Sequence, residues 1–408
     1  MSFEMPLEMP RPHDRSPRIL APRLAGSLLA LAAAGALGAC TDEQSVAYGT
    51  QSLRVELVAP AVTGSPEMPL PDGARQIPLR VTALDAEGKV DASLSADLRL
   101  FVQYLGSMTP ALDSAAPLTT LRMNSGAATG MVNLPPVYGP TVIWVEHSSG
   151  TSPTYATGTS PRLWYREPTI SDISTPADEG SLAALATSPL ELKQARVETS
   201  RYGARGRLVV TSVYSQGYTV SDVNCADASG TPPCTTGNYD HVTIFTFSAP
   251  RDEKGYEIKV GQVIPGFTGG VTEFNGLTEL GFPQTFSSGG EPLVNPALLP
   301  EPKVLQQSWF GQRIEFERVE SSPIAVLGGK VCPVDADYDR FKQWKLDVGN
   351  GCSGDVINVV TSGVLDFDPA ANAGRVLPRV VGALRPINIG SFNVWIIYPR
   401  FAQDITLQ

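Results

Sequence analysis

Short runs of alternating apolar and polar residues, separated by glycine and proline, recur along most of this chain. Examples are SLRVELVAP from Ser52, ADLRLFVQYLG from Ala96 and HVTIFTFSAP from His241. Residues that alternate in this way place their apolar side chains on one face of a β-strand. The 38 glycines and 35 prolines are about as numerous as all charged residues, and both residue types interrupt helices. Because 42% of the 408 residues are hydrophobic and no Gly-X-Y period occurs, we expect a mostly β globular protein.

The N-terminal segment has the form of a bacterial export signal. Four arginines lie within residues 11–23, and the next 16 residues, from Leu24 to Ala39, carry no charge. A basic region followed by a short apolar region and small residues is typical of a secretory signal peptide, and a membrane span needs roughly 20 residues. The residues before the basic region are acidic and proline-rich, so translation starts at Met1 or at Met9.

The end of this segment, Leu37-Gly38-Ala39-Cys40, resembles the lipobox of bacterial lipoproteins. The resemblance implies cleavage before Cys40, whose thiol then carries a diacylglyceryl group that anchors the protein to a membrane. Because residue 41 is Thr rather than Asp, the same resemblance implies sorting to the outer membrane. The alternative is an ordinary signal peptide in which a cysteine occurs by chance.

The four other cysteines predict two disulfides, because an even number of cysteines is typical of disulfide bonding in an exported chain. Three pairings are possible. We favour the two short-range pairs, Cys225 with Cys234 and Cys332 with Cys352, each of which would close one loop. The spacings match no zinc site, and we expect no metal and no cofactor.

The strand pattern predicts several β modules. The segment LRMNSGAATGMVNLPPVYGPTVIWVE, residues 121–146, resembles bacterial Ig-like domains, which implies a β-sandwich. The Cys-Trp-Cys pattern of antibody domains is absent. After the sandwich, TPADEGSLAALATSPLELKQ predicts a connector with at most one short helix.

A second kind of module follows, with five predicted strands that suit a small barrel. Val210–Asp222, Val260–Val263 and Gly269–Leu280 resemble the OB-fold domains attached to secreted bacterial nucleases and related surface lipoproteins. The resemblance implies the fold and not the nuclease activity, which resides in other domains of those proteins.

The last hundred residues repeat this five-strand plan. Strands are expected in RIEFERVESSPIAVLGG, QWKLDVG, DVINVVTSGVLDF, RVLPRVVGALRPINIG and FNVWIIYPR, and Gly382 and Pro399 align with Gly269 and Pro283. We favour tandem barrels over one barrel with a long insertion. The expected segments are a signal peptide (1–39), a tether (40–50), an Ig-like sandwich (51–168), a connector (169–195) and two OB-like barrels (196–303 and 304–408).

No motif of a known catalytic class occurs in the sequence: G-x-S-x-G, H-E-x-x-H and the P-loop pattern are all absent. Of the three histidines, His13 precedes the expected cleavage site and we expect His147 to be exposed. His241 follows Asp240, and neighbours on a strand point to opposite faces. We therefore expect His241 to be structural, with a role as ligand or base as the alternative, and we expect no enzyme.

One acidic loop is spaced like the start of an EF-hand. Asp335, Asp337 and Asp339 fit, but the sixth position is Arg340 and the twelfth is Leu346. An EF-hand needs glycine and glutamate at those positions. We expect a solvated acidic loop inside a disulfide.

A candidate ligand face is predicted on the first barrel. Tyr214 and Tyr218 flank the turn SQG and Arg207 lies upstream, and barrel ligand faces commonly carry aromatic and basic residues. The alternative is that the tyrosines fill the end of the barrel and the arginine is solvated. With a net charge of −10, we expect no nucleic-acid partner.

These observations lead to three functional hypotheses. We expect a non-catalytic, envelope-anchored lipoprotein that serves as a binding or assembly module at the cell surface or in the periplasm. Its partners would be the membrane, through the lipid, and a protein or polysaccharide that the sequence does not identify. The alternatives are a glycan or single-stranded polyanion binder acting through the first barrel, and a degenerate or accessory subunit of a secreted enzyme.

Overall fold

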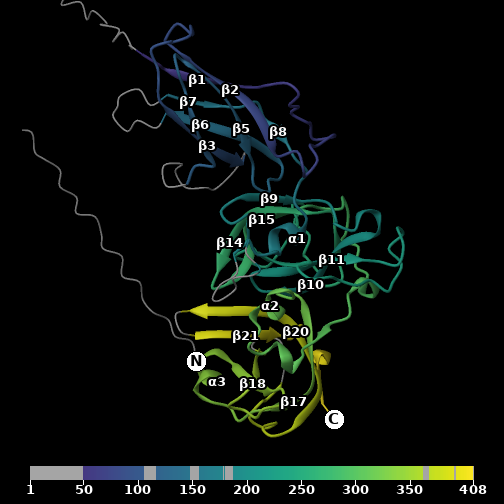
Figure 1. The fold of residues 1–408 in the computed structure, drawn as a ribbon. Coiled ribbons are helices and arrows are strands. Elements are labelled where there is room, and N and C mark those ends of the chain that lie inside the picture. The colour runs from purple at the N-terminus through teal and green to yellow at the C-terminus, as the bar shows by residue number, and fades with distance from the viewer. Residues whose placement is uncertain are drawn as a thin grey trace, which may run out of the picture. The chain divides into compact units, whose positions relative to one another are not determined.

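The computed structural model describes residues 49–104, 116–147, 156–177, 179, 187–361, 367–389 and 392–407. All of them belong to one structural unit, residues 48–408. The expected signal peptide, the lipobox with Cys40 and the SLAALA helix lie outside the described residues. Strands account for 44% and helices for 9% of the structure, which confirms a mostly β fold, with a sandwich followed by barrel-like units (Figure 1). Within the described ranges, no helix has the length and apolar character needed to cross a membrane.

The first module is a sandwich of two antiparallel sheets. In β1, Leu53 and Val55 point into the core while Arg54 and Glu56 face solvent, as the alternating sequence predicts. One sheet has the order β1-β2-β5, and the other has the order β4-β3-β6-β7 with β8 paired to β6. The strands are β1 (Ser52–Leu57), β2 (Gln76–Leu84), β3 (Asp97–Tyr104), β4 (Thr119–Arg122), β5 (Ala127–Asn133), β6 (Pro140–His147), β7 (Thr157–Thr159) and β8 (Leu163–Trp164).

The second module, here called the first barrel unit, is a seven-stranded sheet with the order β13-β10-β11-β12-β15-β14-β9. Strands β12 and β15 are parallel, and the other pairs are antiparallel. A short helix, α1 (Ile170–Ser174), precedes it. Its elements are β9 (Gln194–Val197), η3 (Gly203–Arg205), β10 (Gly206–Tyr214), β11 (Gly217–Asn224), β12 (His241–Phe245), β13 (Val263–Ile264), β14 (Phe267–Phe274) and β15 (Leu277–Thr285).

The third module, the second barrel unit, has the order β16-β17-β18-β19-β21-β20-β22, and an additional β17–β20 pairing closes five strands into a barrel. Strands β19 and β21 are parallel. The elements are β16 (Lys303–Val304), η5 (Gln307–Trp309), α2 (Arg313–Glu317), β17 (Pro323–Val331), α3 (Ala336–Phe341), β18 (Gln343–Asp347), β19 (Val356–Val360), β20 (Val376–Ile389), β21 (Phe392–Tyr398), η6 (Ala402–Asp404) and β22 (Ile405–Thr406). Before them, η4 (Pro296–Leu298) packs on the first barrel unit through Leu298.

The two barrel units share one strand plan. In each sheet, the first three strands of the plan lie side by side and antiparallel. The fifth strand lies next to the third and parallel to it, and the fourth strand lies beyond the fifth. The aligned glycines lie on the two fourth strands, and each approaches the aligned proline: a Cβ on Gly269 would lie 3.4 Å from the Cα of Pro283, and one on Gly382 would lie 2.9 Å from the nitrogen of Pro399. Two separate sheets of the same order are tandem units, not one barrel with an insertion.

One strand prediction is wrong. The sequence RIEFE forms helix α2 and not the first part of a strand, which begins only at Pro323. Arg313 and Glu317 form an i,i+4 ion pair of 2.7 Å, and Phe316 is buried. Ion pairing at this spacing stabilises a helix and has no counterpart within a strand.

Both predicted disulfides are confirmed. Cys225 and Cys234 close the loop after β11, and Cys332 and Cys352 join the end of β17 to the turn between β18 and β19. Their S–S distances are 2.04 and 2.13 Å. The first disulfide belongs to a small buried cluster with Val209 and Leu298, and the second encloses α3 and β18, whose Trp344 and Leu346 are buried in the core of the second unit.

Candidate ligand-binding site

The two tyrosines predicted for the ligand face, Tyr214 and Tyr218, lie in different environments. The Tyr218 side chain is completely buried, and its hydroxyl is hydrogen-bonded to the Thr285 hydroxyl. Burial raises the pKa of the Tyr218 phenol, which therefore stays neutral. This corrects the expectation for Tyr218, because a ring inside the core has no face left for a ligand. Tyr214 lies across the hairpin from Gly217 and lines a groove.

Arg207, the third residue predicted for the ligand face, has a structural role. Its guanidinium donates hydrogen bonds to the backbone oxygens of Ala204, Gly206 and Ala228, at 2.8, 2.6 and 2.6 Å. The bond to Ala228 holds the loop of the first disulfide against β10, and the other two are made to residues just before Arg207. Arg207 does not line the groove that contains Tyr214.

That groove, the junction groove, lies where the two barrel units meet and has a volume of about 330 Å³. The first unit contributes the hairpin of β10 and β11, and the second contributes the end of β19 together with β20 and β21. Its main lining residues are Ser212, Tyr214, Ser215, Val360, Arg385 and Tyr398. Cavities of this size fall within the range of small-molecule sites.

Arg400 fixes the two walls of the junction groove relative to each other. Its Nη1 donates to the Thr211 oxygen of β10 at 3.2 Å, and its Nε and Nη2 bind the two oxygens of Asp404, each at 3.0 Å. Both members of this ion pair are nearly buried. A guanidinium held at a carboxylate and a carbonyl has little rotational freedom, so the walls are preorganised.

Arg385 is the charged group of the junction groove. Its guanidinium carbon lies 5.2 Å from the centre of the Tyr214 ring and 5.6 Å from that of Tyr398, which are cation–π distances. Among the described residues, the guanidinium takes part in no hydrogen bond or ion pair. Its N–H groups are therefore free to bind an anion, and guanidinium suits carboxylate, sulfonate or phosphate oxygens.

Glu279 is an acidic group that interacts electrostatically with Arg385. Burial raises the pKa of Glu279, and the positive charge of Arg385 acts in the opposite direction. The net shift of the Glu279 pKa is upward.

His241 is buried, with 2% of its surface exposed. Its Nδ1 is hydrogen-bonded to the Ser221 hydroxyl at 2.7 Å, while its Nε2 is buried without a partner among the described residues. Burial, with the charges of Lys303 and Arg201, lowers the pKa of His241 well below its usual range. Asp240 points the other way and pairs with Arg201 at 2.7 Å. An imidazole enclosed in this way cannot meet a substrate in this conformation.

The acidic loop caps a helix. The Asp335 side chain accepts a hydrogen bond of 3.0 Å from the Asp337 backbone N–H at the start of α3 and pairs with Lys345 at 2.7 Å. The N-terminal end of a helix favours a negative charge. In the described part of the chain, no three His, Cys, Asp or Glu side chains are grouped to hold a metal ion.

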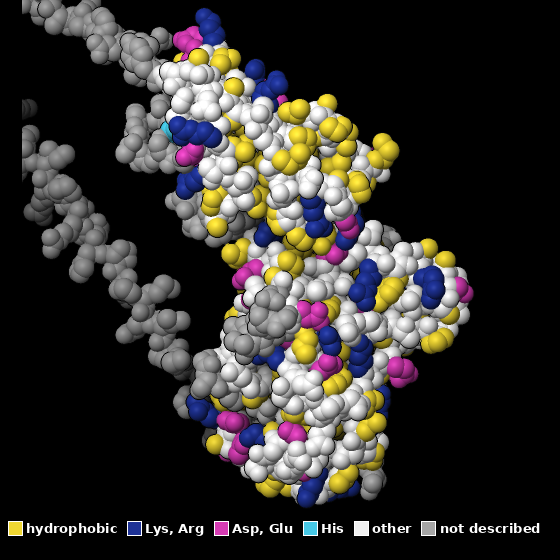
Figure 2. All heavy atoms as spheres, viewed as in Figure 1, with side chains coloured by type: hydrophobic (Ala, Val, Ile, Leu, Met, Phe, Trp, Pro, Cys, Tyr) yellow, Lys and Arg dark blue, Asp and Glu magenta, His cyan; other side chains and the backbone are white. Residues whose placement is uncertain are grey.

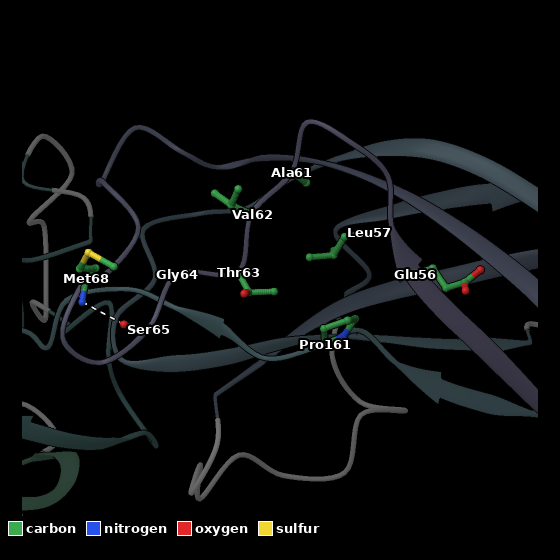
Figure 3. A pocket seen from close by; sticks show the side chains of 9 residues that line it. All are labelled: Glu56, Leu57, Ala61, Val62, Thr63, Gly64, Ser65, Met68 and Pro161. Atoms are coloured by element: carbon green, nitrogen blue, oxygen red, sulfur yellow. Dashed lines mark hydrogen bonds between the residues drawn. The ribbon is translucent and has the colours of Figure 1, made fainter.

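A separate depression on the sandwich, of about 610 Å³, is shown in Figure 3. Its lining includes exposed Val62 and Met68, and the Met68 backbone N–H donates to the Ser65 hydroxyl. Figure 3 shows the side chains spread over the end of β1, the loop that follows it and Pro161, without converging on a point. Glu56 is its one charged lining residue, so the depression lacks the convergent polar groups that orient a ligand.

Comparison with protein-family models, curated proteins and solved structures found no match to this chain. The site is therefore argued from its own residues. Sequence reasoning identified Tyr214 but missed Arg385 and Tyr398. The available signal was a single arginine in the otherwise apolar run VVGALRPINI, paired with a strand that ends in tyrosine.

Proposed function

We propose that this protein is a non-catalytic binding lipoprotein of the cell envelope, and that the junction groove is its ligand site. The observation that carries the proposal is Arg385, held between the rings of Tyr214 and Tyr398 with its N–H groups unpaired among the described residues. A guanidinium does not release a proton at physiological pH, so this group suits holding an anion better than proton transfer.

The anchor is the second part of the proposal. The lipobox-like sequence ending in Cys40 would attach the chain to the outer membrane, with the sandwich as a spacer. The shared strand plan of the two barrel units supports their resemblance to OB-fold domains, and the two packed sheets support an Ig-like spacer. In cells, labelled palmitate should enter the protein and be lost in Cys40→Ser. Labelling that persists in the variant would refute the anchor.

Polyanions are less suitable ligands than single small anions. On the face shown in Figure 2, basic side chains are interspersed with acidic ones and form no continuous tract. Backbone recognition of a nucleic acid or anionic polymer needs several aligned cations. The lining of the junction groove contributes one.

The test is binding of 1-naphthalenesulfonate, a fluorescent planar anion without an alkyl tail. Arg385→Gln should weaken binding about tenfold or more, because hydrogen bonds to charged groups contribute roughly 1.5–3 kcal/mol. Arg379→Gln is the matched control, since Arg379 lies on the same strand, β20, outside the groove. Equal affinities for the two variants, or no binding by the unaltered protein, would refute the proposal.

A further inference from the structure

A second cavity adjoins the junction groove. This apolar cavity has a volume of about 490 Å³. Val360 and Tyr398 line both spaces, so the two are neighbours that share these side chains. The remaining lining of the apolar cavity consists of Phe341, Ile387, Ile389, Ile396, Gln343 and Asp337.

The lining of the apolar cavity leaves large hydrophobic side chains in contact with water. Phe341 and Ile389 are each 58% exposed. Each square ångström of apolar surface removed from water is favourable by about 25 cal/mol. A bound alkyl chain would cover these side chains, and the cavity is therefore suited to a hydrophobic ligand.

Strand β20 connects the charged and apolar ends. Arg385, Ile387 and Ile389 are alternate residues of this strand, so they project from the same face. At about 3.3 Å per residue, Arg385 and Ile389 are roughly 13 Å apart along the strand. A ligand lying along β20 would therefore place one end at a cation and extend over isoleucine side chains.

The polar groups of the apolar cavity set the direction of such a ligand. Gln343 is buried, and its side-chain amide donates to the Asn358 side chain at 3.0 Å, so one of its two N–H groups is already used there. Asp337 also lines the apolar cavity and would repel a negative head group. An anionic head is favoured only at Arg385.

We propose that the junction groove and the apolar cavity together bind a single-chain amphiphile, with its anionic carboxylate or phosphate at Arg385 and its unbranched alkyl tail over Ile387 and Ile389. This inference rests on the proposed function, because it names the ligand class of the same groove. A free fatty acid and a single-chain phospholipid share this chemistry.

The experiment is calorimetric titration of the mature protein with alkanoates of 6 to 12 carbons, below their micelle concentrations. Affinity should rise about fourfold per methylene, the factor that corresponds to about 0.8 kcal/mol per buried methylene. Dodecanol, with the same tail and no charge, should bind at least about tenfold more weakly than dodecanoate. Monododecyl phosphate distinguishes a fatty acid from a single-chain phospholipid as the ligand, since tighter binding than that of dodecanoate would indicate a phospholipid head group.

Ile389→Ser should reduce the dependence of affinity on chain length and leave 1-naphthalenesulfonate binding unchanged. The matched control is Leu327→Ser, since Leu327 is 53% exposed on β17 and lines neither space. An affinity independent of chain length, with sulfonate binding still sensitive to Arg385→Gln, would refute the amphiphile and leave the proposed function standing. Sulfonate binding insensitive to Arg385→Gln would refute the proposed function itself.

Discussion

Because Glu273 is buried, we expect the free energy of unfolding to fall as the pH rises toward neutrality. Its Oε1 accepts hydrogen bonds from the Ser188 backbone N–H, at 2.7 Å, and the Thr278 hydroxyl, at 3.0 Å, but its Oε2 is buried without a partner among the described residues. Burial is the largest cause that raises the pKa of Glu273 to about 7, and the negative charges of Glu191 and Glu317 add to it. The folded protein therefore holds a proton here that the unfolded chain has lost.

The size of the effect follows from the pKa difference. The ordinary value is 4.5, so the shift of about 2.5 units corresponds to about 3 kcal/mol. Between pH 4.5 and 7 the folded state binds more protons than the unfolded state, and stability contributed by this group falls as pH rises. Glu273→Gln keeps an oxygen for the two hydrogen bonds and removes the charge. It should match the unaltered protein near pH 5 and be more stable by about 3 kcal/mol at pH 8.

Urea denaturation of both proteins at pH 5, 6, 7 and 8 measures this difference. Buried His241 has a lowered pKa, which gives a pH dependence of opposite sign, but it is present in both proteins and cancels. Glu87→Gln, which removes an exposed carboxylate, serves as the control. A Glu273→Gln variant whose advantage does not grow between pH 5 and pH 8, or that is less stable at pH 8, would contradict the reasoning.

Three further predictions concern the first barrel unit and the groove. Replacing both Cys225 and Cys234 by serine should lower the free energy of unfolding by about 2–4 kcal/mol, measured in urea against the reduced and oxidised parent. Tyr218→Phe should lower the free energy of unfolding by about 1 kcal/mol, because the hydrogen bond to Thr285 is lost, and should leave 1-naphthalenesulfonate affinity unchanged. Weaker sulfonate binding without a loss of stability would instead show that Tyr218 contacts the ligand. Glu279→Gln should tighten 1-naphthalenesulfonate binding about fivefold, roughly 1 kcal/mol, by removing the charge that opposes an anion at Arg385; unchanged affinity in fluorescence titration would contradict this.

Local patterns were sufficient to predict most of the fold. Alternation located the strands of both barrel units, and glycine and proline markers at similar but unequal spacings, Gly269 to Pro283 and Gly382 to Pro399, predicted the repeat. The helix over Arg313–Glu317 was missed because its alternating letters fit a strand as well as a helix. Periodicity over five residues does not separate the two, and the tertiary contacts of Phe316 with Trp309 and Trp395 decide the outcome.

The candidate site was harder to predict for two physical reasons. A register shift between Val210 and Ser212 in β10 reverses which residues face the core, so counting along the strand could not place the tyrosine that follows it. The second reason is distance in sequence, because Tyr214 and Arg385 are brought together only by the packing of two modules. No local pattern encodes such a contact.

The nature of the junction between the barrel units explains why a groove persists there. The second unit has an apolar core of its own, and contacts between the units include hydrogen bonds, such as the 2.7 Å bond between the Thr243 and Ser321 hydroxyls and the 2.8 Å bond from the Tyr239 N–H to the Arg318 oxygen. Directional bonds fix how the two units meet without requiring that their surfaces close completely. Since one wall carries Tyr214 and the other Arg385, neither unit alone can form the ligand site, and the tandem arrangement is what creates it.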